Sequence, residues 1–298
     1  CTLLLLWPWT MTHAQAQDAD TVYQTSQPWH KRLFVRSELQ KKSNTEAANL
    51  WQVVQQNVQL DTASRRKAVQ SEMRWYANNK TYLKRTLTRA DPYLYHIVNE
   101  LQARNLPLGL AVLPIVESAY DPFAFSHGGA AGLWQLMPTT AKHFGVEQNW
   151  WYDGRRDLYD STTAALDYLA YLGRFFNHDW ALALAAYNAG EGTVQRAMQR
   201  NKRMGLKTDF WSLRLPKETQ TYVPRILALA EIVSDPSRIG LELPYVPNVA
   251  VIDWVELEHQ IDLGVASKLA NISLADLYKL NPGYNHWSTA PDGPHRLF

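Results

Sequence analysis

The chain has 298 residues, of which 46% are apolar or aromatic and 19% are charged. This composition predicts a globular protein with a sizeable core. Thirty basic residues face 28 acidic ones, for a net charge of +2, and no basic block is long enough to follow a phosphate backbone, which argues against nucleic acid as a partner. The aromatic load is high, with 12 Trp, 15 Tyr and 8 Phe. Flat rings fit the apolar faces of sugars as well as a protein core.

The N-terminus opens on Cys1 and a short apolar run that reaches Ala14-Gln15-Ala16. An apolar run before a small-x-small pattern is typical of a secretory signal, so residues 1–16 are interpreted as a truncated signal remnant. The alternative is that Cys1 is the lipidated first residue of a lipoprotein, and both interpretations stay open. No run approaches the roughly 18 apolar residues of a spanning helix. Residues 17–45 are polar and aperiodic, which predicts a linker.

Residues 46–90 carry apolar side chains at three-to-four spacing, which predicts helices that brace the domain after them. Asp91 and Pro92 predict the cap and first turn of a further helix that ends near Asn105. Another helix is predicted from Leu108 to Ser118.

The remaining central segment, up to residue 240, is also predicted to be helical. Three glycines within residues 126–132 exclude a regular element there. The expected helices start at Pro138, run from a Ser161 cap through Phe175, run from Trp180 to Ala189 with closure by Gly190 and Gly192, and run from Thr219 to Ile232.

Residues 248–298 differ in character from the helical part. A β-prone run near Val249 to Leu257 precedes two short helices, Leu263 to Ala270 and Ser273 to Asn281, and Arg296 to Phe298 begins a closing strand. The pattern predicts a small βαα(β) module whose last strand is cut short, so we expect the natural chain to continue.

Glu117 is the most informative residue, because it follows the apolar run Leu113-Pro114-Ile115-Val116. Apolar surroundings disfavour the charged carboxylate and raise its pKa, which predicts a general acid. Glycosidases usually need a second carboxylate. The other nearby acids stand where turn and cap acids normally stand: Asp121, Asp153, Asp157, Asp160 and Glu191.

Four motifs occur in order: Glu117-Ser118, Gly132 to Pro138, Ala186 to Gly190, and Tyr222-Val223-Pro224. Together they resemble the lytic transglycosylases with the goose-type lysozyme fold. The resemblance implies a mainly α protein, with a lysozyme-like (goose-type/SLT) catalytic domain over residues 91–240 and bracing helices before it.

The resemblance also implies an activity, which is non-hydrolytic cleavage of the β-1,4 bond between N-acetylmuramic acid and N-acetylglucosamine in peptidoglycan. Glu117 would protonate the glycosidic oxygen and then, as a base, deprotonate the C6 hydroxyl of the same sugar, closing a 1,6-anhydro ring. The expected partner is the glycan strand, and the expected location is the periplasm, with outer-membrane association. Two alternatives remain: a hydrolysing lysozyme of the same fold, and a glycan-binding scaffold without catalysis.

By the same resemblance, six residues would line the sugar cleft: Ser118, Gln135, Met137, Tyr187, Asn188 and Tyr222. An extended backbone would point Gln135 and Met137 to one side. Four of the six also have a structural explanation: Ser118 and Asn188 as helix-end caps, and Met137 and Tyr222 as core side chains. The nine His show no metal-ligand spacing, so no metal site or cofactor is expected.

The C-terminal module resembles a LysM domain, which binds N-acetylglucosamine in glycans. The match lies in Ile261 to Leu263, Val265 to Ala270, Ile272 to Leu277 and Leu280 to Pro282. Gln260-Ile261-Asp262 stands where Gly-Asp-Thr is usual. We therefore favour a structural appendage over a glycan-binding module.

Overall fold

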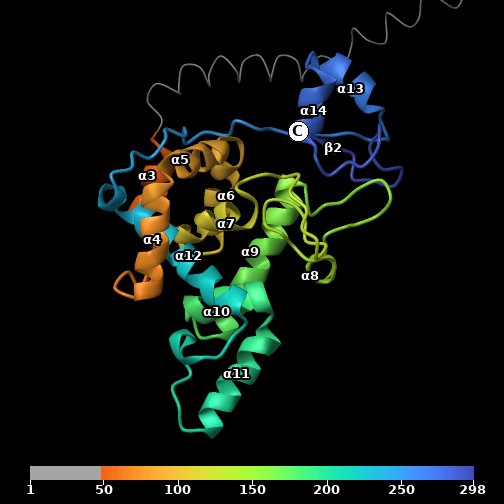
Figure 1. Cartoon of the computed structure of the whole chain (residues 1–298). Helices are drawn as coiled ribbons and strands as arrows, with labels where there is room; N and C mark the ends of the chain where they lie inside the picture. Colours follow the sequence, from red (N-terminus) through yellow and green to blue (C-terminus); the bar gives the residue numbers. More distant parts are fainter. Residues whose placement is uncertain (1–47) are drawn as a thin grey trace, which may run out of the picture. The chain divides into compact units, whose positions relative to one another are not determined.

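The computed structural model describes residues 48–298 and is built mainly from helices (Figure 1). The expected signal remnant and linker, residues 1–16 and 17–45, lie outside the described residues. The α-helices are α3 (Leu50–Gln56), α4 (Lys67–Asn78), α5 (Lys80–Arg89), α6 (Asp91–Ala103), α7 (Leu113–Ser118), α8 (Pro138–His143), α9 (Leu158–Phe175), α10 (Trp180–Ala189), α11 (Glu191–Arg203), α12 (Lys217–Ser234), α13 (Leu263–Ala270) and α14 (Leu274–Leu280). Three 3-10 helices, η1 (Leu108–Val112), η2 (Phe210–Ser212) and η3 (Pro236–Ile239), and two strands, β1 (Val255–Glu256) and β2 (Arg296–Leu297), complete them. The mainly α prediction is confirmed.

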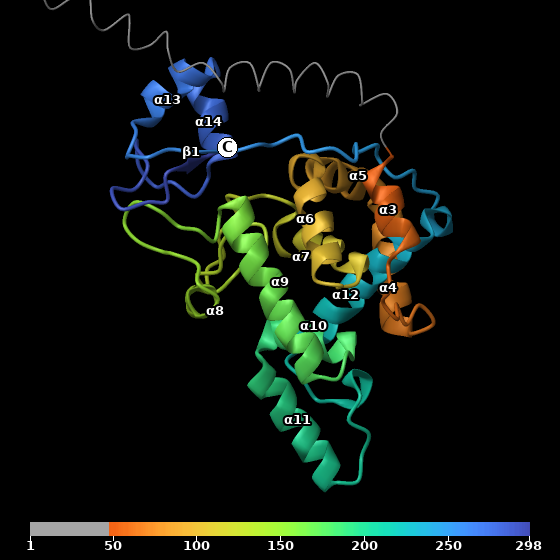
Figure 2. The same ribbon diagram turned by 180° about the vertical axis from the view of Figure 1, so that it is seen from behind.

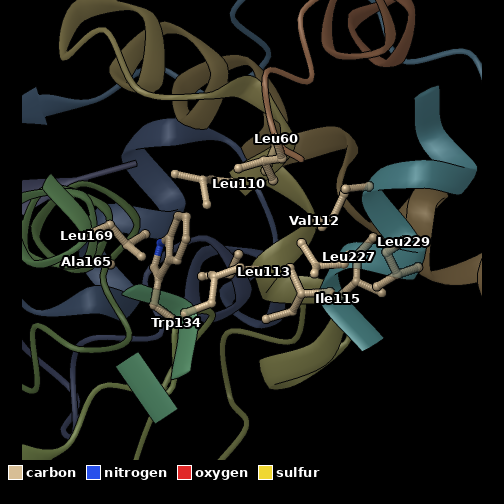
Figure 3. Packing of buried hydrophobic residues seen from close by; sticks show 14 of the residues in the cluster. Leu60, Leu110, Val112, Leu113, Ile115, Trp134, Ala165, Leu169, Leu227 and Leu229 are labelled. Carbon is tan, nitrogen blue, oxygen red and sulfur yellow. The ribbon is translucent and has the colours of Figure 1, made fainter. Parts of the chain in front are cut away.

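Helix α12 packs against α3, α4, α7 and α10. Figure 3 shows Leu227 and Leu229 of α12 beside Val112 and Ile115, while Trp134 lies toward α9. These side chains are at most 2% exposed. Complete burial of one such apolar side chain contributes about 1.5–3 kcal/mol. Helix α7, which carries Glu117, is therefore packed between α12 and the buried side chains near Trp134.

The bracing helices α3 to α5 precede this core, as the spacing predicts (Figures 1 and 2). The indole of the buried Trp51 donates from Nε1 to the carbonyl of Leu87 at 3.2 Å, which ties α3 to α5. The predicted cap at Asp91 is wrong, because α6 begins at Asp91 itself and Ala90 before it already has helical angles. The predicted helix Leu108–Ser118 is in fact a 3-10 turn, η1, followed by α7.

The second half of the helical part contains α9, α10 and α11 in succession. The predicted Ser161 cap is wrong, because α9 starts at Leu158 and the side chain of Asp157 accepts from the first free amides. Gly190 does end α10, but Gly192 does not close it, because Gly192 lies in the first turn of α11. Helix α11 was not predicted. Figures 1 and 2 show α10 beside α12, which agrees with their packing.

The C-terminal module has the predicted order of one strand, two helices and one strand. Strands β1 and β2 pair antiparallel, with Val255 opposite Leu297. Its small core includes Leu263, Leu277 and Leu297 together with Tyr152, which comes from the loop between α8 and α9. The module thus completes its core with a side chain of the preceding domain. Within residues 48–298, no helix is long and apolar enough to cross a membrane.

Candidate functional site

Glu117 is the penultimate residue of α7, a helix of six residues. The helix ends abruptly because Ala119 and Tyr120 both take left-handed angles, with φ of 53° and 59°. Residues other than glycine adopt this backbone conformation only where the surrounding structure holds them in it. The hold is visible at Tyr120, which is fully buried and donates its hydroxyl to the carbonyl of Ala111 at 2.6 Å. The carboxylate of Glu117 therefore projects from a rigid helix end.

The carboxyl group of Glu117 is kept in its protonated form up to neutral pH. Its burial raises the pKa to about 7, the hydrogen bond from the Tyr222 hydroxyl opposes that rise, and the negative charge of Glu218 adds to it. Among residues 48–298, no Lys or Arg forms an ion pair with Glu117. A carboxyl group with a pKa near the working pH can both give and take a proton.

Two tyrosines surround this carboxyl group. Tyr222, from α12, is buried and donates its hydroxyl to Oε1 of Glu117. Tyr187, from α10, donates its hydroxyl to the carbonyl of Trp134 at 2.8 Å. Burial, followed by the charge of Glu117, raises the pKa of both hydroxyls well above the ordinary value. Both remain neutral hydrogen-bond donors at any pH at which the protein works.

The side chain of Asn188 is held by the start of α12, whose Glu218 acts on the pKa of Glu117. Its Oδ1 accepts from the Thr219 hydroxyl at 2.7 Å, and its Nδ2 donates to Oε1 of Glu218 at 3.4 Å. Sequence reasoning missed Thr219 and Glu218. The signal was available, since Glu218 precedes Tyr222 by one helical turn and shares its helix face.

Ser118 is held by backbone carbonyls. Its hydroxyl lies 2.9 Å from the carbonyl oxygen of Leu133 and 3.2 Å from that of Pro114. The first of these contacts ties the end of α7 to Leu133, which follows the glycine loop, residues 126–132. The side chain therefore has a structural role as a staple between two parts of the site.

Residues 132–135 form a tight turn, so the expected extended backbone is wrong at Gln135, although Met137 is extended. Gln135 has a φ of 47°, and its side-chain Nε2 donates to the carbonyls of Ala124 and Gly132 at 3.0 and 2.9 Å. Met137 follows with 44% of its surface exposed, which excludes the interpretation of it as a core residue. Gln135 thus shapes the loop, while Met137 stands free at the surface.

The glycine loop lies directly on the backbone at Arg155. A Cβ on Gly132, whose φ is +80°, would stand 1.8 Å from the carbonyl oxygen of Arg155, so only glycine fits. The guanidinium of Arg155 is nearly buried, pairs with Asp153 at 2.8 Å and donates to the carbonyl of Gly129 at 2.6 Å. This contact fixes the loop that carries Gln135 and Met137.

A groove of about 800 Å³ lies to one side, lined by residues of α8, α9 and the start of α11. Glu117 does not line it. Tyr168 does, and its ring lies 5.5 Å from that of Tyr187, while its hydroxyl donates to Glu191 at 3.3 Å. The groove therefore adjoins the site through Tyr187. No group of three potential metal ligands occurs among the residues that the structure describes.

Two protein families match parts of this chain. Residues 95–210 match the transglycosylase SLT domain family, and residues 251–298 match the LysM-like domain of lytic transglycosylase MltD. These matches define the class, and the chain belongs to the lytic transglycosylase family that carries an SLT domain.

Among individual proteins, the chain is similar to membrane-bound lytic murein transglycosylase D of Escherichia coli K12, with 42% identity over 76% of this chain and 50% of the relative. It thus spans about half the length of that relative. It is also 40% identical to a putative tributyltin chloride resistance protein of an Alteromonas species, over 59% of this chain and 84% of that one. A solved lytic transglycosylase Slt from Pseudomonas aeruginosa, an inactive mutant, is 27% identical over 59% of this chain and 31% of its own, with a TM-score of 0.42.

Proposed function

We propose that the protein cleaves the β-1,4 bond between N-acetylmuramic acid and N-acetylglucosamine in peptidoglycan without water, leaving a 1,6-anhydro end. The observation that carries the proposal is the carboxyl group of Glu117, with its pKa near 7 and the Tyr222 hydroxyl on its Oε1. Membership of the lytic transglycosylase family supports it. Residues 91–240 form the catalytic domain in this proposal, residues 46–90 its brace and residues 248–298 the appended module.

In the first step, Glu117 transfers its proton to the glycosidic oxygen, and the bond from that oxygen to C1 of the muramic sugar breaks. The acetamide carbonyl of the same sugar steadies the positive charge that develops at C1. In the second step, the C6 oxygen bonds to C1 while its proton passes to the Glu117 carboxylate. One carboxyl group is then regenerated, and no water is consumed.

The surrounding groups orient this exchange. Tyr222 donates to Glu117 in the charged form as well as the neutral one, which steadies the carboxylate between the two steps. Asn188, fixed by Thr219, is a donor and acceptor for the acetamide. Tyr187, Ser118, Gln135 and Met137 complete the wall of the cleft, with Met137 as an exposed apolar contact.

The masses of the products test the proposal. Digestion of peptidoglycan by the parent chain should release muropeptides with anhydro ends, which are lighter by one water than hydrolysis products. Reduction with borohydride provides the control, because an anhydro end has no reducing group and keeps its mass. Products that gain a water would establish a lysozyme instead, and an absence of cleavage would favour a scaffold without catalysis.

Hydrolysis is the second candidate because Glu218 is a carboxylate whose charge acts on Glu117. In that case Glu218 would activate a water molecule as base. Replacing Glu218 with Gln distinguishes the two functions, since a hydrolase should lose most of its rate while the transglycosylase keeps Glu117 as both acid and base.

We further propose a periplasmic location with membrane association, because the relative from E. coli is described as membrane-bound. Cell fractionation tests it, and recovery of the protein in the cytosol would contradict it. Lipidation of Cys1 would appear as a mass increase of the mature chain.

A further inference from the structure

A group of aromatic rings lies at the junction of the α8–α9 loop and the C-terminal module. Trp150 and Trp287 are 61% and 59% exposed, although most large aromatic side chains of the described chain are buried or partly buried. His286 stacks on Trp150, with ring centroids 3.4 Å apart and planes inclined by 22°. Trp151 lies between the two exposed indoles, in edge contact with Trp150 at 4.8 Å and with Trp287 at 5.8 Å.

The rings are held rigidly by the backbone on which they stand. Asn285 donates its backbone amide to the carbonyl of Trp151 at 2.8 Å and its Nδ2 to that of Trp150 at 3.2 Å. Its Oδ1 accepts a hydrogen bond from the guanidinium of Arg156. Within the loop, Oδ1 of Asn149 accepts from the amides of Trp151 and Tyr152 at 2.8 Å each. Exposed aromatic rings that are already ordered lose little entropy when a ligand binds.

The loop also continues directly from the proposed catalytic site. Gln148 donates its Nε2 to the carbonyl of Pro138 at 3.1 Å, and Pro138 follows Met137 in the chain. The start of the loop that carries Trp150 is therefore tied to the segment that carries Met137.

The composition of the two segments defines the kind of partner. Residues 147–154 and 285–288 contain no Leu, Ile, Val, Met or Lys, and they add Asn149, Asn285 and Glu147 to the rings. A membrane-binding surface would need aliphatic side chains with basic ones. A nucleic-acid platform would need cations free to meet phosphates, whereas the guanidinium of Arg156 at this junction is bonded to Oδ1 of Asn285. Flat apolar faces bordered by amides fit a ligand that is flat and apolar on its faces and polar at its edge, which describes an N-acetylated pyranose.

We propose that Trp150 and Trp287 form a second, non-catalytic platform that binds the pyranose rings of a glycan strand. The inference rests on the proposed function for the identity of the glycan. It gives the C-terminal module a part in substrate binding through the face that meets the α8–α9 loop.

Binding to an insoluble glycan tests the platform. The 298-residue chain and its Trp150→Ala, Trp287→Ala and double variants are sedimented in the cold with peptidoglycan stripped of its peptides. Each single change should weaken binding about fivefold or more, by loss of one ring contact. Trp75→Ala is the matched control, because Trp75 is an exposed indole, at 48%, on α4. Thermal unfolding checks that every variant is folded.

Two further substitutions separate stacking from general apolar contact. Trp150→Phe keeps a ring and should retain most of the binding, whereas Trp150→Leu keeps apolar surface without a flat face and should bind like Trp150→Ala. Equal binding of Trp150→Leu and the parent would overturn the platform, as would equal binding of the double variant and the parent.

Cleavage rates on long strands and on a short soluble glycan fragment are measured in the same preparations. The ratio of the two rates should fall in the double variant. A parent chain that binds the glycan but cleaves neither substrate would overturn the proposed function and leave the platform standing. Binding of phospholipid vesicles that is lost in the double variant would overturn the platform, because it would assign these rings to a membrane.

Discussion

Carboxylates are withdrawn from water in two parts of this molecule, and different partners surround them. Glu117 has a tyrosine hydroxyl and a distant negative charge for neighbours. Asp157 and Asp160, at the start of α9, both contact the guanidinium of Arg296, from β2, at 2.8 Å. At the first site the carboxyl group of Glu117 can exchange a proton with a substrate. At the second site the carboxylates form ion pairs that join the C-terminal module to α9.

The second site is also enclosed by aromatic rings. The guanidinium of Arg296 lies 5.5 Å from the ring centre of Tyr159 and 5.3 Å from that of Phe298. Burial lowers the pKa of Arg296, but the neighbouring carboxylates outweigh burial and leave it raised. Arg296 is therefore permanently charged. Burial, followed by the charge of Asp160, also raises the pKa of Asp157, but here the guanidinium of Arg296 opposes that rise, whereas no cation is paired with Glu117.

The largest expected effect is on catalysis at the first site. Glu117→Gln keeps the shape and the acceptor for Tyr222 but has no proton to transfer, so the rate of muropeptide release should fall by about 10² to 10⁴. Release of soluble fragments from peptidoglycan measures the change. An unchanged rate in a folded variant would remove Glu117 from the mechanism.

At the second site we expect a loss of stability. Arg296→Met keeps much of the apolar stem but leaves Asp157 and Asp160 facing each other without a cation, which should lower the free energy of unfolding by about 3–5 kcal/mol. Urea unfolding measures it. Lys279→Met is the matched control, because its pair with Asp276 is highly exposed and should contribute less than about 1 kcal/mol. Equal losses in both variants would show that the ion pairs of Arg296 contribute no more than an exposed surface pair.

Stability should also depend on pH through Glu117. Its folded-state pKa, about 7, is above the ordinary value of 4.5, so the folded protein binds this proton more tightly than the unfolded chain. The stabilising contribution is fully present below pH 4.5 and is lost as the pH rises to about 7. From pH 4.5 to 8 the parent should therefore lose about 3 kcal/mol relative to Glu117→Gln. Urea unfolding of both chains at the two pH values measures the difference, and a constant difference would contradict the raised pKa.

The comparison also shows what the sequence could predict. The apolar spacing of α9, α10 and α12 reveals buried helices, and an acid within an apolar run reveals Glu117, because both signals are local. Helix α11 was not predicted because Gly192 in its first turn resembles a residue that ends a helix. The turn at Gln135 was not predicted for a different reason. It depends on a hydrogen bond to the carbonyl of Ala124, which comes close to Gln135 only in the folded loop.

Contacts between distant segments could not be predicted from local patterns. Arg296 and Asp157 are 139 residues apart, and nothing near either residue indicates the other. Glu218 is exposed and resembles any acid in the first turn of a helix, so its action on Glu117 appears only when α12 is packed beside α7. The resemblance to the lytic transglycosylases predicted Tyr222 because this residue is part of the motif Tyr222-Val223-Pro224, whereas Glu218 lies outside that motif.

The smallest expected effect concerns the hydrogen bond within the first site. The Tyr222 hydroxyl lowers the pKa of Glu117, so Tyr222→Phe should raise that pKa further. Because the first step needs protonated Glu117, the limb on which kcat/KM falls with rising pH should move upward by about one unit. Tyr187→Phe is the control, since that hydroxyl donates to the carbonyl of Trp134, and its shift should be smaller. A downward shift in Tyr222→Phe would mean that the hydroxyl stabilises the protonated acid, and the first site would then hold its proton by hydrogen bonding as well as by burial.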